Sequence, residues 1–285
     1  MQKSRLAAVP PCVPLLLTAA PLTAHAADDA RQVAVPAYFY PGDLWTRMSR
    51  PGARAGLAVA NPANGPGSSA IPAYAQTIQA AEAGDTKVLG YVDSGYLGTT
   101  GWKDPGTEDA SVAGWLAAAK ENVDKWYAWY GPSGLSGIFF DDGLVPCGSA
   151  PGRTDWVDAY RSLQAHVKGK DPAATVVINP GAAPESCYTR AADTLVTFEG
   201  SYDTYRTWTP PAWAAAAPPS KSWHLVHETA TRSRMEGAVM LSKQRRAGHV
   251  YVTDDDNTPL PGTPWGNPWD TLPPYWEALV RTVRS

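Results

Sequence analysis

Eight short runs of β-branched and aromatic residues recur along the chain, and they constrain its fold more than any other feature. Each run ends in polar or glycine-rich residues, and most are followed by a segment with helical periodicity. Strands that are apolar nearly throughout and alternate with helices predict a parallel sheet buried on both faces. The runs cover residues 33–40, 56–65, 87–96, 137–143, 175–181, 194–202, 223–229 and 249–256.

The segment 111–130 gives the clearest helical pattern between these runs. Its apolar residues recur with helical period, which predicts a helix that packs one face on the sheet: Val112, Trp115, Leu116, Ala119, Val123, Trp126, Tyr127 and Tyr130. The segments after the first, fifth and sixth strands are short or interrupted by proline and alanine. Eight strands with intervening helices predict one α/β domain, a single (β/α)₈ TIM barrel. Further helices are expected at 71–84, 154–168, 232–247 and 272–284.

The first 26 residues have the pattern of a secretory signal peptide. Lys3 and Arg5 form a positive start, Leu15–Leu17 lies in a short apolar region, and Ala24-His25-Ala26 matches a small-x-small cleavage site. A membrane anchor is disfavoured because prolines interrupt a run already shorter than the roughly 20 residues of a span. We therefore expect residues 1–26 to be removed and residues 27–285 to form one secreted, extracellular catalytic domain.

The charge balance disfavours two classes of partner. The whole chain has a net charge of −3. Removing the signal takes away two positive charges and no acid, which leaves a net charge of about −5. Neither nucleic acid nor an anionic membrane surface is expected to bind such a chain. Nothing in the sequence sets the oligomeric state, and a monomer is the default.

Of the three cysteines, Cys12 lies in the predicted signal, so Cys147 and Cys187 remain in an oxidising compartment. A disulfide between them is favoured, and closing a loop of about 40 residues would stabilise the fold by about 3 to 4 kcal/mol. Two separate thiols are the alternative, since geometry decides whether a bond can form.

In a TIM barrel the active site is built at the carboxyl ends of the strands, and here these ends are unusually polar. Carboxylates, amides and tyrosines follow almost every strand, so one rim is expected to collect them. In chain order the rim residues are Tyr38, Tyr40, Asn61, Asn64, Tyr91, Asp93, Asp141, Asp142, Asn179, Glu199, Tyr202, His227, Glu228, Asp254, Asp255 and Asp256.

Two carboxylates on different strands are the apparatus of glycoside hydrolysis, in which one protonates the leaving oxygen and the other attacks the sugar or activates water. Asp141 and Glu199 are the candidate pair. The apolar residues before Glu199 predict a partly buried carboxyl with a raised pKa, which suits a general acid. Because side chains alternate along a strand, Asp141 and Asp142 are expected to face opposite ways unless the strand ends there, so only one should point fully into the barrel mouth.

Several segments together resemble the spherulin-4-like (spherulation-specific family 4) glycoside hydrolases. They occur in the order of that family and extend over about residues 33–276: LAVANPANGPG, VLGYVDSGY, GIFFDDG, LVTFEGSY, WHLVHET, VYVTDDD and the closing DTLPPYW. The resemblance implies a (β/α)₈ barrel that cleaves α-1,4-linked N-acetylgalactosamine in galactosaminogalactan, a biofilm exopolysaccharide. It also implies Asp141 and Glu199 as the catalytic pair. The family has Asp-Glu where this chain has Asp141-Asp142, which puts the supporting role of Asp142 in doubt.

The resemblance and the polar rim together give a set of residues expected to bind the polysaccharide: Tyr38, Asn61, Tyr91, Asp93, Asp142, Asn179, Tyr202, His227 and Asp254. An acid-lined groove attracts a galactosamine polymer that becomes cationic when deacetylated. Tyr38, Tyr91, Tyr202, Trp102 and Trp265 could stack on sugar faces. Asp141 is provisionally the nucleophile and Glu199 the acid/base, although the opposite assignment stays open.

No cofactor and no metal are expected. His224 and His227 are three apart on a strand, which places them on opposite faces. Pro259 and Trp265 stand where a calcium loop starting at Asp254 needs glycine and glutamate. Three alternatives to the hydrolase remain: a non-catalytic lectin-like barrel of the cell surface or matrix, a structural spore or envelope protein, and a polysaccharide deacetylase, which usually needs a metal.

Overall fold

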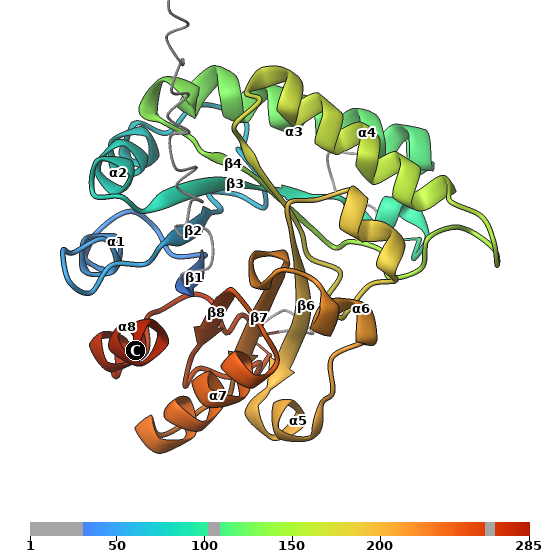
Figure 1. The fold of residues 1–285 in the computed structure, drawn as a ribbon. Helices are drawn as coiled ribbons and strands as arrows, with labels where there is room; N and C mark the ends of the chain where they lie inside the picture. The colour runs from blue at the N-terminus through green and yellow to red at the C-terminus, as the bar shows by residue number, and fades with distance from the viewer. Residues whose placement is uncertain (1–30, 102–108, 260–265) are drawn as a thin grey trace, which may run out of the picture.

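The strands of the computed structural model close into one barrel in chain order, with β1 hydrogen-bonded to both β2 and β8 (Figure 1). The structure describes residues 31–101, 109–259 and 266–285. All eight neighbouring pairs are parallel. The predicted TIM barrel is therefore confirmed. Its strands are β1 (Gln32–Ala37), β2 (Leu57–Ala60), β3 (Lys87–Asp93), β4 (Gly137–Asp141), β5 (Thr175–Ile178), β6 (Thr194–Ser201), β7 (Ser222–His227) and β8 (His249–Val252).

The α-helices surround the barrel (Figure 1). The helical segments after the first, fifth and sixth strands are short, as the sequence predicted. The crossover from β5 to β6 contains only a 3₁₀ helix, η3 (Ser186–Arg190). Within the described residues, no helix is long and apolar enough to cross a membrane. The α-helices are α1 (Asp43–Met48), α2 (Pro72–Ala83), α3 (Val112–Tyr130), α4 (Asp155–Lys170), α5 (Tyr202–Thr207), α6 (Ala212–Ala216), α7 (Arg232–Gln244) and α8 (Trp276–Arg284), and further 3₁₀ turns are η1 (Gly95–Gly98), η2 (Gly131–Ser133) and η4 (Pro219–Lys221).

Close packing of helix on strand explains the predicted stripe of α3. The Trp126 ring lies so near β3 that a Cβ atom on Gly90 would come within 2.4 Å of it. The indole Nε1–H of Trp126 donates to the Tyr91 carbonyl at 2.7 Å. The glycine thus lets the helix approach, and the buried indole keeps a hydrogen-bond partner.

Aromatic side chains fill the barrel interior below its mouth. The Phe139 ring of β4 lies 5.5 Å from the Trp223 ring of β7 and 6.2 Å from the Tyr91 ring of β3. Asp141 lies two residues after Phe139, so alternation along β4 points its side chain to the same inner face. The packed rings therefore close the barrel beneath the polar rim.

Candidate active site

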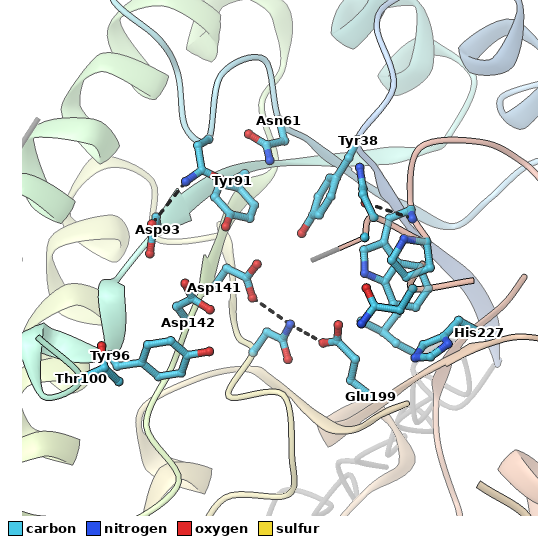
Figure 2. Close-up of a pocket in the computed structure, with 18 of the residues that line it drawn as sticks. Tyr38, Asn61, Tyr91, Asp93, Tyr96, Thr100, Asp141, Asp142, Glu199 and His227 are labelled. Carbon is cyan, nitrogen blue, oxygen red and sulfur yellow. Dashed lines mark hydrogen bonds between the residues drawn. The ribbon is translucent and has the colours of Figure 1, made fainter. Parts of the chain in front are cut away.

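A pocket of about 910 Å³ opens at the carboxyl ends of the strands. Figure 2 shows acids and tyrosines of several strands pointing into it. Its lining contains four carboxyl groups and, among the described residues, no lysine or arginine. The lining residues are Tyr38, Asn61, Asn64, Tyr91, Asp93, Tyr96, Thr100, Gly101, Asp141, Asp142, Asn179, Glu199, Leu225, His227, Asn257, Gly266, Asn267, Pro268 and Trp269.

Asn179, at the end of β5, links the two candidate catalytic acids. Its Nδ2 donates to Asp141 Oδ1 at 2.8 Å and to Glu199 Oε2 at 2.7 Å. Gly181 N–H donates to its Oδ1 at 2.9 Å, which fixes the orientation of the amide. The two carboxylate oxygens are therefore at most about 5.5 Å apart, the sum of the two hydrogen-bond distances.

Both neighbouring aspartates line the pocket, whereas only one was expected to point into it unless the strand ended there. β4 ends at Asp141, and Asp142 adopts a left-handed backbone with φ 51°. Asn179 N–H donates to the Phe140 carbonyl, so a regular parallel ladder would continue from the N–H of Asp142 to the Asn179 carbonyl. Gly143 N–H makes that bond instead, at 2.8 Å. The extra residue is a β-bulge, and it turns two consecutive side chains to one side.

Gly143 is required by this bulge. A Cβ atom on it would lie 2.8 Å from Ile178 Cγ2 and 3.1 Å from the Asn179 carbonyl oxygen. The motif GIFFDDG therefore combines a buried strand, two acids and a residue small enough to rejoin β5.

Burial and the charges of neighbouring carboxylates raise the pKa values of the acids in the pocket. Burial raises the pKa of Asp141 well above its ordinary value, and the charges of Asp142 and Glu199 raise it further. Burial also raises the pKa of Glu199, against hydrogen bonds from Asn179 and Trp269 that lower it. Burial raises the pKa of Asp142 as well, while its hydrogen bond to Tyr96 has the opposite effect. The site is therefore suited to hold a proton for transfer.

Seven of the nine residues predicted to bind substrate line the pocket. The Tyr38 and Tyr91 rings meet edge to face at 5.4 Å. Asp93 Oδ2 accepts from Asn64 Nδ2 at 3.3 Å. Asn61 also lines the pocket, but its Oδ1 accepts from the Gly65 N–H at 3.0 Å and supports the loop after β2.

His227, at the end of β7, occupies the opposite wall (Figure 2). Burial lowers the pKa of its imidazole, and the nearby Glu228 carboxylate partly offsets this effect. Its Nδ1 lies 3.1 Å from Glu228 Oε1. Glu228 itself is exposed and does not line the pocket.

Two of the nine residues expected to bind the polysaccharide lie outside the pocket, as do the rim residues Tyr40, Glu228, Asp255 and Asp256. Tyr202 begins α5, because Ser201 ends β6 and accepts from the Thr204 N–H as a helix cap. The Tyr202 ring then faces Arg234 of α7 at 5.4 Å. Asp254 also does not line the pocket, and its charge instead acts on Tyr251 and Tyr275.

Two aromatic residues of the pocket were missed by the sequence prediction. Trp269 precedes α8, and its ring lies 6.0 Å from that of His227. Tyr96 hydrogen-bonds to Asp142 from η1. Tyr96 lies within the third apolar run, where its aromatic ring could have signalled a role, whereas Trp269 carries no such signal. Trp102 and Trp265, the other stacking candidates, lie outside the described residues.

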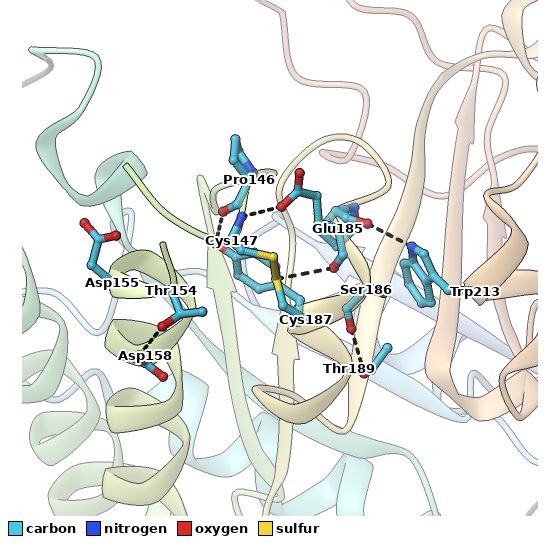
Figure 3. The surroundings of a disulfide bond; sticks show 12 residues. Pro146, Cys147, Thr154, Asp155, Asp158, Glu185, Ser186, Cys187, Thr189 and Trp213 are labelled. Atoms are coloured by element: carbon cyan, nitrogen blue, oxygen red, sulfur yellow. Dashed lines mark hydrogen bonds between the residues drawn. A yellow bond between two sulfur atoms is a disulfide. The ribbon is translucent and has the colours of Figure 1, made fainter. Parts of the chain in front are cut away.

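The predicted disulfide is present and links the segments that follow β4 and β5. Cys147 and Cys187 are bonded, with their Cα atoms 6.1 Å apart. Figure 3 shows that the bond joins the connection after β4 to η3. Glu185 supports it, because its Oε2 accepts from the Cys147 N–H at 2.7 Å. The two sulfurs are consumed by this bond and offer no thiolate to a metal.

Comparison with known families identifies the chain. The sequence model of spherulation-specific family 4 matches residues 32–283. The chain belongs to this family. Spherulin-4 of Physarum polycephalum is 27% identical over 256 residues, which cover 84% of this chain and 69% of that protein. The family expected from the motifs is therefore confirmed.

Solved structures show the same barrel. The crystal structure of Aspergillus clavatus Sph3 in complex with GalNAc superposes with a TM-score of 0.67 at 23% identity, covering 90% of this chain and 98% of that chain. An FMN-binding beta-glucuronidase from Facaelibacterium prausnitzii L2-6 has a TM-score of 0.54 at 11% identity and covers 88% of this chain and 44% of that chain. At these identities the likeness concerns the fold.

Proposed function

We propose that the protein is a secreted glycoside hydrolase that cuts within chains of α-1,4-linked N-acetylgalactosamine or galactosamine-rich exopolysaccharide. The observation that carries this proposal is the pair of partly buried carboxyl groups, Asp141 and Glu199, bridged by one amide in an open pocket. The GalNAc complex of Aspergillus clavatus Sph3 supports the choice of sugar. The predicted signal and the disulfide support an extracellular location.

The spacing of the pair favours a retaining mechanism. Retaining glycosidases place their carboxyl groups about 5 to 5.5 Å apart, whereas inverting enzymes leave about 6.5 to 9.5 Å for a water molecule. The limit of about 5.5 Å between the bridged oxygens of Asp141 and Glu199 agrees with the first class.

Two steps follow from this geometry. Asp141 attacks the anomeric carbon while Glu199 donates its proton to the glycosidic oxygen, so an ester forms as the C–O bond breaks. Glu199 then takes a proton from water, whose oxygen attacks the same carbon and releases Asp141 as carboxylate. We propose Asp141 as nucleophile because Tyr91 and the Asp142 N–H donate to it, in addition to the Asn179 amide that it shares with Glu199. These donors favour its carboxylate form and so oppose the burial and like charges that raise its pKa.

Digestion of purified galactosaminogalactan tests the proposal. The mature protein is expected to release soluble oligosaccharides detectable by mass spectrometry, and Glu199→Gln to release none. A range of product lengths would indicate internal cleavage. A parent protein that binds the polymer but releases no oligosaccharide would contradict hydrolysis and favour a lectin-like barrel.

A further inference from the structure

A chain of buried hydroxyl groups lies behind the two neighbouring aspartates. Ser94, directly after β3, and Tyr160 of α4 are both fully buried, and neither lines the pocket. Ser94 Oγ lies 2.6 Å from the Asp141 carbonyl oxygen, 3.0 Å from that of Asp142 and 2.9 Å from the Tyr160 hydroxyl. These hydroxyls therefore act on the backbone of the site.

The direction of the hydrogen bonds follows from the groups involved. Carbonyl oxygens only accept, so the single Ser94 hydroxyl proton must point at Asp141 and Asp142. The Leu144 N–H donates to the Tyr160 oxygen, which leaves the Tyr160 proton for Ser94. The chain thus runs from Leu144 through Tyr160 and Ser94 to the two carbonyls.

This chain stabilises a backbone that would otherwise be unfavourable. Asp142 has φ 51°, and Tyr96 and Leu97 opposite it have φ 49° and 50°. Non-glycine residues adopt this region only where their surroundings impose it. The Tyr96 N–H donates to the Asp142 carbonyl at 2.7 Å, and the Ser94 N–H donates to that of Asp141 at 3.0 Å.

We infer that Ser94 and Tyr160 are positioning residues that hold the bulge and thereby keep the Asp142 carboxyl group inside the pocket beside Asp141 and Glu199. This inference rests on the proposed function. Without the Ser94 hydroxyl, β4 can return to the regular ladder, in which the Asp142 N–H pairs with the Asn179 carbonyl. Alternation then turns the Asp142 side chain away from Asp141 and from the pocket.

The pH dependence of turnover reports the position of Asp142. Its negative charge raises the pKa of Asp141 and Glu199, so its departure lowers both values. As the pH is raised, turnover then begins to fall at a lower pH than in the parent, because the general acid has a lower pKa and loses its proton sooner. The titratable side chains that share the pocket with Asp142 are Tyr38, Tyr91, Asp93, Tyr96, Asp141, Glu199 and His227.

The test compares pH–rate profiles of Ser94→Ala and Tyr160→Phe with the parent. We expect the high-pH limb to move down by about half a pH unit or more in both variants. Adding Asp142→Asn to Ser94→Ala should move it no further than Asp142→Asn alone. Ser242→Ala is the matched control, because its buried hydroxyl donates to the Val239 carbonyl at 2.7 Å within α7.

The outcomes separate this inference from the proposed function. A parent without turnover contradicts hydrolysis, whereas an active parent with unshifted variants contradicts the role of Ser94. A crystal structure of Ser94→Ala tests the geometry independently of turnover. We expect Asp142 outside the pocket there, and an unchanged bulge would overturn the inference. Tyr160→Phe keeps the ring packing and serves if Ser94→Ala does not fold.

Discussion

Strands β4 and β8 both run into aspartates, yet the two groups of acids have different environments. At the end of β4, burial raises the pKa of Asp141 and Asp142 within the pocket. After β8, Asp256 is exposed, and hydrogen bonds from Thr258 lower its pKa. Its Oδ1 accepts from the Thr258 N–H at 2.9 Å and shapes the loop. Aspartates at the end of β4 thus line the pocket, whereas Asp256 after β8 stabilises a turn.

The neighbouring strands explain the difference. Ser94, directly after β3, and Asn179, directly after β5, donate to the end of β4 from its two sides. At the end of β8, the Asp256 side chain accepts from Thr258, two residues further on, and its own N–H donates to Asp255 Oδ1 at 2.9 Å. Residues distant in sequence thus hold Asp141 in the pocket, whereas residues of its own loop hold Asp256 outside it.

The largest expected effect separates Asp141 from Asp256. Asp141→Asn should lower kcat by about 10³-fold or more, because an amide cannot form the ester intermediate. Asp256→Asn, the matched change after β8, should leave kcat within about twofold. Steady-state release of reducing ends measures both, and equal losses in the two variants would remove the distinction between the strands.

Thermal unfolding shows whether the Asp141→Asn protein remains folded. The pKa of Asp141 is raised in the folded state, so the folded form binds the proton more readily than the unfolded form. Its contribution to stability therefore falls as the pH rises from the unfolded to the folded pKa. At pH 7, Asp141→Asn should melt at or above the temperature of the parent.

Removing the amide bridge should have the next largest effect. Asn179→Ala frees both carboxyl groups, and misplacement of reacting groups by about 1 Å can cost about 10²-fold in rate. We expect kcat to fall by that factor. Asn61→Ala is a useful comparison, since Asn61 lines the pocket but its side-chain oxygen accepts from the Gly65 N–H. If Asn61→Ala lowered kcat as strongly, the bridge would have no special role.

A smaller effect is expected at Asp142. Asp142→Asn should lower kcat by about tenfold at neutral pH. It should also move the high-pH limb to lower pH, since the Asp142 charge raises the pKa of Asp141 and Glu199. Asp254→Asn, outside the pocket, should leave the profile in place. A limb that moves upward in Asp142→Asn would show that the sign of this coupling is wrong.

The smallest effect on turnover is expected from the disulfide. The Cys147→Ser, Cys187→Ser double variant should lose about 3 to 4 kcal/mol of unfolding free energy, because the closed loop of 40 residues is released. Its kcat should change by less than about threefold, since neither cysteine lines the pocket. Urea unfolding and initial rates provide the two numbers. Unchanged stability with strongly reduced turnover would instead assign the disulfide to positioning Asp142.

The barrel could be predicted because its signal is local and repeated. Each apolar run marks a strand, and the five longer helices lie close to their expected ranges. The short segments after the first, fifth and sixth strands could also be predicted, because proline and alanine interrupt their helical pattern. Strand ends were set too late: the second run was expected to extend to residue 65, but β2 ends at Ala60, since its polar residues belong to the loop.

The site was only partly predictable because its geometry depends on non-local contacts. Strand ends point to one rim, which brings Asp141 and Glu199 together. The bulge depends on Ser94 and on Gly143 pairing with β5, which alternation alone does not reveal. For Tyr202 a local signal existed: Ser201 caps a helix, so the chain had already left the strand.

The stereochemistry of the first product tests the central claim most directly. Proton NMR during the first minutes of galactosaminogalactan digestion reports the anomer at each new reducing end. The Asp141 and Glu199 pair, bridged by Asn179, predicts that the α anomer appears first and then equilibrates with the β anomer. Initial appearance of the β anomer, or no new reducing ends, would contradict the account.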